Sequence, residues 1–154
     1  MNIPNFIFII LILFQLKLSA QFSVENFLNE PLGKTTNIIK DELSGEKIEE
    51  NRSGDFYRIT YFDWLAPISI KVNLLFNNDN KEISKAIMNA KESEADAKKL
   101  FDILDKELLK KYGNYISEHS LFGITRYSWF GAGGSMVTLT CESKKTRLQV
   151  MVFK

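Results

Sequence analysis

The residues of this chain that could carry out acid–base, nucleophilic or metal chemistry are few and scattered. The sequence holds one histidine, His119, in the polar stretch SEHS, and one cysteine, Cys141. A Ser-His-Asp or Cys-His site would have to use His119, yet no nucleophile motif such as G-x-S-x-G accompanies it. A structural zinc site usually takes four Cys or His ligands, which the chain lacks. We therefore expect no catalytic residue, no metal ligand and no cofactor. A small secreted hydrolase or ligand-binding enzyme that uses His119 or loop carboxylates is the alternative.

Two further segments have residue types that bind small ligands. Gly131, Gly133 and Gly134 raise the question of a phosphate-binding loop, but such a loop needs GxxxxGK[ST] leading into a helix. Here the glycines precede a strand pattern and no Lys follows them, which favours a hairpin link. Residues 77–80 together with Glu82 are rich in oxygen ligands, but Lys81 interrupts them and the calcium-loop pattern is not matched.

Aromatic side chains gather around the first predicted strand of each half of the chain. Tyr61–Phe62 and Trp129–Phe130 are adjacent pairs, so the alternation of a strand points the two members of each pair to opposite faces. Some of these rings must form core, whereas aromatic residues exposed on an uncovered sheet face are typical of a binding surface. The candidate binding residues are therefore Tyr61, Phe62, Trp64, Trp129 and Phe130.

Two helices and six strands are predicted to position these residues. A short helix begins at Thr35 or Thr36 and stops near Gly45, and a longer amphipathic helix begins after Ser93 and stops at Gly113. Alternation predicts strands at residues 56–62, 68–76, 126–130, 135–142 and 146–153. Residues 82–89 fit a helix or a strand, and their place after a turn favours the strand. Residues 22–32 are expected to be an irregular lead-in, and residues 46–55 and 114–125 to be loops.

The order of these elements indicates a possible tandem repeat of one helix and three strands. Strands joined by short turns must be antiparallel. The expected fold is therefore α+β, with an antiparallel sheet and two helices packed on one of its faces. In residues 135–142, Cys141 shares a face with Val137 and Leu139, which favours a buried thiol over a reactive one.

The N-terminal residues have the pattern of a secretory signal. Residues 6–14 are an unbroken apolar run, shorter than the roughly 20 residues that span a bilayer, and Ala20 ends the polar stretch that follows. We expect cleavage after Ala20, a single domain at residues 21–154 and an exported protein, periplasmic or secreted; a retained anchor is the alternative. The 20 Lys and Arg balance 19 Asp and Glu, so no basic surplus indicates nucleic acid or acidic lipid as a general partner.

The arrangement of these segments also resembles that of known exported domains. PLGKTTNIIKDEL and DAKKLFDILDKELLKKYG, the latter followed by SW and VTL, resemble stretches of small exported α+β proteins of Bacteroidetes-type bacteria. More distantly, the pattern is similar to the fold of the outer-membrane assembly lipoprotein BamE and the β-lactamase inhibitor protein. The resemblance implies binding of other proteins through the sheet or its loops, with no catalytic residues to carry over. The lipid-bearing Cys of BamE has no counterpart at the predicted cleavage site. We therefore expect a non-enzymatic domain that binds a protein or an envelope component.

Overall fold

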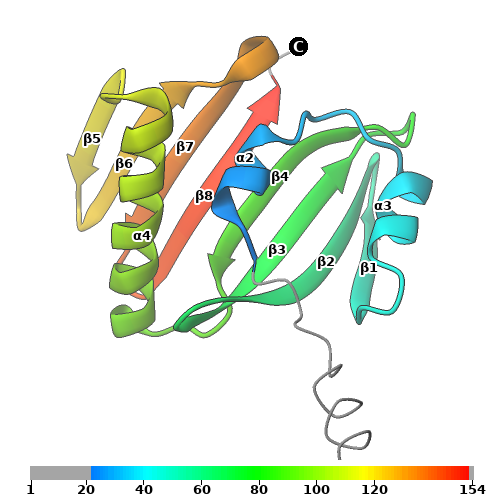
Figure 1. The fold of residues 1–154 in the computed structure, drawn as a ribbon, viewed down its shortest axis with the longest axis horizontal. Helices are drawn as coiled ribbons and strands as arrows, with labels where there is room; N and C mark the ends of the chain where they lie inside the picture. The colour runs from blue at the N-terminus through cyan, green and yellow to red at the C-terminus, as the bar shows by residue number, and fades with distance from the viewer. Residues whose placement is uncertain (1–21, 153–154) are drawn as a thin grey trace, which may run out of the picture.

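The computed structural model describes residues 22–152, so the predicted signal at residues 1–20 lies outside the described residues. They form an α+β fold with one antiparallel sheet in the strand order β1-β2-β3-β4-β8-β7-β6-β5 (Figure 1). The helical elements are α2 (Val24–Asn29), α3 (Thr36–Glu42), α4 (Glu94–Tyr112) and the 3₁₀ turn η1 (Ala132–Gly134). The strands are β1 (Ile48–Ser53), β2 (Phe56–Leu65), β3 (Ile68–Phe76), β4 (Glu82–Asn89), β5 (Ser117–Leu121), β6 (Ile124–Phe130), β7 (Ser135–Glu142) and β8 (Lys145–Val152).

The long helix and the glycine-rich link agree with the sequence. Ser93 caps α4 by accepting a hydrogen bond from the Asp96 N–H at 3.3 Å, and Gly113 ends the helix with a positive φ of 73°. Between β6 and β7, the Gly131 N–H donates to the Ser135 carbonyl at 2.8 Å, and Gly133 has a φ of 65°. The glycines therefore serve a hairpin connection, as predicted.

Both predicted helices are present, the long one as α4 and the short one as α3, but the helical layer also holds a helix that was not predicted. α3 has seven residues, and a further short helix, α2, occupies the stretch expected to be irregular. α2 forms because the Ser23 hydroxyl accepts from the Asn26 N–H at 3.1 Å, while Phe27 and Leu28 are buried against the rest of the core. Six residues of weak periodicity are too few to signal this helix, which packing stabilises.

Each half of the chain has four strands instead of the three predicted. The strands that the pattern missed, β1 and β5, were expected to be loops and are the two edges of the sheet. Their residues are mostly polar and exposed, so they lack the alternation that marks a half-buried strand. They are strands because their neighbours β2 and β6 offer free backbone groups, which antiparallel pairing satisfies.

The two halves meet at a pseudo-two-fold axis in the middle of the sheet. β4 and β8 pair antiparallel, with Ala86 opposite Gln149 at the centre of their register. An alignment of the two halves on their common Arg and Phe pairs Arg58-Ile-Thr-Tyr-Phe62 with Arg126-Tyr-Ser-Trp-Phe130, and the strand pairings are compatible with it. The pairing across the centre obeys the same symmetry, since the pair Lys85–Val150 is the counterpart of the pair Ile87–Leu148.

The core lies between the sheet and the helices. From α4, Leu100, Leu104 and Leu108 are fully buried against β7 and β8. The sheet contributes the alternate residues of its central strands, which are Ile59, Ile70, Val72, Leu74, Phe76, Ile87, Trp129, Val137, Leu139 and Leu148. Burial of each large apolar side chain contributes about 1.5–3 kcal/mol, so this single layer stabilises both halves together.

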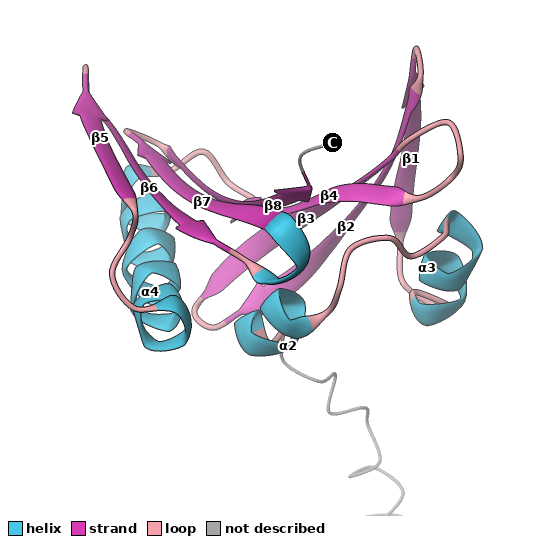
Figure 2. Ribbon diagram, turned by 90° about the horizontal axis from the view of Figure 1, so that it is seen from above, coloured by secondary structure: helices cyan, strands magenta, loops and turns pink. Residues whose placement is uncertain are grey.

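No helix of residues 22–152 covers the opposite face of the sheet. Figure 2 shows α2, α3 and α4 together on one side, while both ends of the sheet bend away from them, so that the uncovered side is concave. Strand twist of a consistent hand produces this curvature when the helices fill only one side. The fold therefore exposes a curved surface that is made of side chains from strands of both halves.

Candidate binding face

The open face is defined here as the outward side chains on the concave side of the sheet. It includes Arg58, Thr60, Phe62, Trp64, Lys71, Asn73, Leu75, Ser84, Ala86, Met88, Arg126, Phe130, Met136, Thr138, Thr140, Glu142, Lys145, Arg147, Gln149 and Met151. Two adjoining hollows of about 420 and 300 Å³ lie on it and share Lys145, Arg147 and Gln149. The hollows meet near the pseudo-two-fold axis, where Ala86 and Ser84 leave room because their side chains are small.

Short polar side chains form the floor of the open face and hold one another in place. Thr60 donates to Asn73 Oδ1 at 2.7 Å, between β2 and β3. Gln149 Nε2 donates to Ser84 Oγ at 3.0 Å, across the join between the two halves. These bonds satisfy part of the polar surface within the protein, so the floor is ordered before any ligand arrives.

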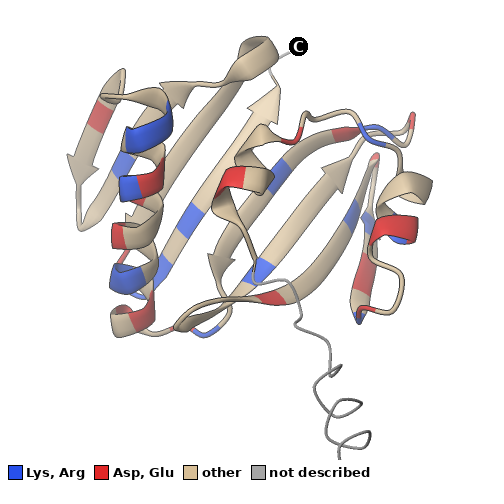
Figure 3. Cartoon of the chain, viewed as in Figure 1, with Lys and Arg blue, Asp and Glu red and all other residues tan. Residues whose placement is uncertain are grey.

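The charges of the open face are mostly positive. Five cationic side chains line the hollows, and Glu142 is the one acidic residue that lines them; the cations are Arg58, Lys71, Arg126, Lys145 and Arg147. In Figure 3, β3 and β8 carry Lys and Arg within their spans and no Asp or Glu. The chain is nearly neutral as a whole, so the excess of cations around the hollows is a local feature of this side of the sheet.

None of these five cations takes part in an ion pair within residues 22–152. The ion pairs of the described residues are Lys34–Glu30, Lys34–Glu42 and Lys40–Glu50, all around α3 and its flanks. Partial desolvation lowers the pKa of Arg147, and the nearby charge of Arg58 lowers it further. Arg58 and Arg147 thus repel each other, and the charge of Glu142, which raises the pKa of Arg147, offsets this only in part.

The candidate aromatic residues divide between the two faces. Phe62, Trp64 and Phe130 are 46%, 51% and 70% exposed, and alternation places them on the open face. Trp129 is 1% exposed within the core, where its Nε1 donates to the Gly113 carbonyl at the end of α4 at 3.0 Å. Tyr61 also points to the helix side, and burial raises the pKa of its phenol well above the usual range.

The symmetry of the sheet places the exposed aromatic rings at opposite ends of the open face. Phe62 and Phe130 are counterparts in the register, as are Arg58 and Arg126. Lys71 lies across from Phe62 in the register, with its Nζ 5.9 Å from the centroid of that ring. This contact leaves the ammonium exposed to solvent and to ligands, because the ring covers only one side of it.

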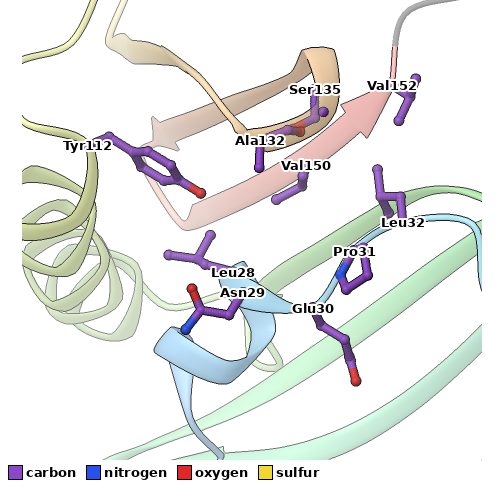
Figure 4. A pocket seen from close by; sticks show the side chains of 11 residues that line it. Leu28, Asn29, Glu30, Pro31, Leu32, Tyr112, Ala132, Ser135, Val150 and Val152 are labelled. Atoms are coloured by element: carbon purple, nitrogen blue, oxygen red, sulfur yellow. The ribbon is translucent and has the colours of Figure 1, made fainter.

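A third hollow lies on the helix side, between α2, the end of α4 and β8 (Figure 4). Its volume is about 180 Å³, and Leu28, Pro31, Leu32 and Val150 line much of it. The Ser135 hydroxyl at its edge already donates to the Ala132 carbonyl at 2.7 Å. The hollow therefore has an apolar lining without an activated nucleophile.

The residues with catalytic potential are not brought together. His119 is exposed in the edge strand β5, opposite Arg126 in the register, and not in a loop as expected. Cys141 is a half-buried free thiol, on the same side of β7 as Val137 and Leu139. Within the described residues, no three His, Cys, Asp or Glu side chains lie close enough together to hold a metal ion.

Sequence reasoning missed two buried titratable residues on the helix side, Lys85 and Glu82. Lys85 of β4 is 3% exposed, donates to the carbonyl oxygens of Phe27 and Glu30 and lies 4.6 Å from the Phe27 ring centroid. Glu82 is 5% exposed, and burial raises its carboxyl pKa to about 7. An alternating strand predicts apolar residues at inward positions, so only the position of α2 explains why Lys85 is tolerated there.

Comparisons with protein-family models, with curated proteins and with solved structures found no match to this chain. In residues 22–152, no helix has the length and apolar character needed to cross a membrane.

Proposed function

We propose that this protein is a non-enzymatic binding domain that holds another protein on the open face of its sheet. The observation that supports this most directly is the combination of Arg and aromatic side chains on a concave surface that no helix of the described residues covers. Arg, Trp and other large side chains contribute most of the binding energy at protein interfaces. The N-terminal signal pattern favours a partner outside the cytoplasm, in the envelope or beyond it.

Exposure of large apolar groups supports a binding role over a purely structural one. Phe130 is 70% exposed and Trp64 51% exposed, and hydration of such surface disfavours the isolated domain. Three methionines, Met88, Met136 and Met151, border the same hollows, and their flexible side chains adapt to the shape of a partner. No comparable combination of features accompanies His119, so the enzyme alternative has no supporting observation within the described residues.

The test is capture of a partner by photo-cross-linking from position 130. The exported protein carries benzoylphenylalanine in place of Phe130, and a matched control carries it in place of Ile38, which is 48% exposed on α3 at the helix side. We expect a discrete adduct from an envelope extract at position 130 and none at position 38. Adducts confined to position 38, or equal at both positions, would contradict binding at the open face.

Truncation of the exposed aromatic side chains measures how much they contribute to the affinity for the partner. We expect Trp64→Ala and Phe130→Ala each to weaken capture of that partner at least tenfold, because each removes a large contact area, while Ile38→Ala leaves it unchanged. Circular dichroism and thermal unfolding check that the variants fold. Unchanged affinity in both aromatic variants would locate the interface elsewhere.

A further inference from the structure

We infer that the partner presents an acidic segment, whose Asp or Glu carboxylates bind a row of cations that crosses the open face. This inference rests on the proposed function and gives the chemistry of the ligand. The row consists of Lys71, Arg147 and Arg126, and these residues are named the cation row below.

The cation row follows from the strand register. Lys71 of β3 lies opposite Met88 of β4, and Met88 lies opposite Arg147 of β8. Arg147 lies opposite Thr140 of β7, which lies opposite Arg126 of β6. A neutral residue therefore separates each cation from the next, and the cations recur on every second strand.

The spacing of the row suits an extended peptide that crosses the strands. Neighbouring strands lie about 4.8 Å apart, so backbone positions on every second strand are roughly 10 Å apart. In a polyproline II segment, which has three residues per turn and a rise of about 3.1 Å per residue, side chains three positions apart lie on the same side and roughly 9 Å apart. A segment with an acidic residue at every third position would bring one carboxylate to each cation.

The cations of the row are available to such a ligand. The ion pairs found within residues 22–152 leave Lys71, Arg126 and Arg147 without a carboxylate within 4.0 Å. Arg126 donates from Nε to Thr140 Oγ1 at 3.3 Å, which orients the guanidinium and leaves its terminal N–H groups for a ligand. Arg58 lies close enough to Arg147 to lower its pKa, so a bound carboxylate would also relieve this repulsion.

The surroundings of the row favour a protein over a nucleic acid. The chain has almost equal numbers of basic and acidic residues, and Glu142 lines the same hollow as Arg126 and Arg147. A phosphate backbone carries a charge at every nucleotide and favours a continuous basic track, whereas neutral side chains interrupt the cation row on every second strand. Between the cations lie Met88 and Thr140, which suit contact with side chains and peptide groups.

The first test uses a synthetic probe. A fluorescent peptide with Glu at every third position, separated by Gly and Ser, is titrated with the protein, and the same peptide with Gln in place of Glu is the control. We expect saturable binding of the Glu peptide that weakens at least tenfold in Arg147→Gln and in Lys71→Gln. Lys106→Gln, on the exposed side of α4, removes the same charge and should leave the affinity unchanged. Equal affinity for the two peptides, no binding, or tighter binding of oligothymidylate would overturn the inference.

The second test uses the natural partner and separates failure of the inference from failure of the proposed function. A carbodiimide joins a lysine amine directly to a carboxylate in contact with it. We expect Lys71 to be joined to an Asp or Glu of the partner, and Lys71→Arg to abolish this link while partner capture persists. Capture that needs Trp64 and Phe130 but is unaffected by Lys71→Gln and Arg147→Gln would overturn the acidic segment and leave the open face as the interface. Capture that depends on none of these residues would overturn both.

Discussion

Glu82 and Lys85 lie three positions apart in β4, and both are buried although each carries a titratable group. Burial is the main cause of the raised pKa of Glu82, and the positive charge of Lys85 opposes it only in part. The groups around Glu82 also include Glu30 and Glu42, which raise its pKa, and Lys34, which lowers it. The folded protein therefore binds the Glu82 proton more tightly than the unfolded chain does.

We predict that Glu82→Gln stabilises the protein at pH 8 and has little effect near pH 5. The pKa rises from 4.5 to about 7 on folding, so the free energy of unfolding falls as pH rises through this window, when the unfolded chain releases the proton first. At pH 8 the neutral amide avoids a buried carboxylate, and we expect a gain of about 2–3 kcal/mol. Urea unfolding at the two pH values measures this change in the free energy of unfolding. Glu49→Gln, on the exposed edge strand β1, is the control. An equal effect of Glu82→Gln at both pH values would contradict the prediction.

At the scale of elements, α2 depends on a single long side chain from the sheet. The Lys85 ammonium reaches the carboxyl end of α2, where it donates to the Glu30 carbonyl at 2.6 Å and to the Phe27 carbonyl. Carbonyl groups in the last turn of a helix lack partners within the helix, and a cation also interacts favourably with the helix dipole there. In the second half of the chain, the register counterpart of Lys85 is Leu148, which packs in the core directly.

We predict that Lys85→Met loosens α2 without disrupting the sheet. Methionine keeps most of the apolar stem but leaves the two carbonyl groups without their donor, at a cost of about 2–3 kcal/mol. Amide hydrogen exchange should accelerate in residues 24–29 and stay slow in β3 and β8. The exposed Lys91→Met is the matched control. Slow exchange of α2 in the Lys85 variant would show that Phe27 and Leu28 hold the helix by packing alone.

At the scale of the whole molecule, the two halves share one core across the pseudo-two-fold axis. Ile87 and Leu148 are fully buried and lie opposite each other in the central pair of strands. α4 contacts strands of both halves, since it packs on β7 and β8 and also on β3 and β4. Separation of the two halves of the sheet would expose this apolar layer to water.

We predict that the domain unfolds in one transition even when the central contact is weakened. Ile87→Ala and Leu148→Ala should each cost about 2–5 kcal/mol, because each leaves a cavity in a close-packed core. Unfolding followed by far-ultraviolet circular dichroism, which reports both halves, should coincide with unfolding followed by the fluorescence of the buried Trp129. Ile38→Ala, at an exposed position, should leave the midpoint unchanged. Separate midpoints for the two signals would show that the halves fold independently.

The sequence predicted the elements whose residues alternate or recur within a few positions. The strand pattern at residues 68–76, the Ser93 cap and the Gly113 stop all appear as expected, because each depends on local backbone and side-chain preferences. The edge strands β1 and β5 were missed because their polar residues carry no such pattern, and pairing with a neighbour makes them strands. α2 was missed for a related reason, since packing and Lys85 hold it.

For the open face, the sequence by itself determined that aromatic residues would point to both sides of β2 and β6, because adjacent residues in a strand always do so. Only the tertiary structure decided which of them are exposed: placing α4 on one side buried Trp129 and left Phe130 in solvent. The cation row could not be predicted from the sequence either, because Lys71, Arg126 and Arg147 are far apart in the chain. They form a row only because strand order and register, which depend on contacts across the whole sheet, set them on one line.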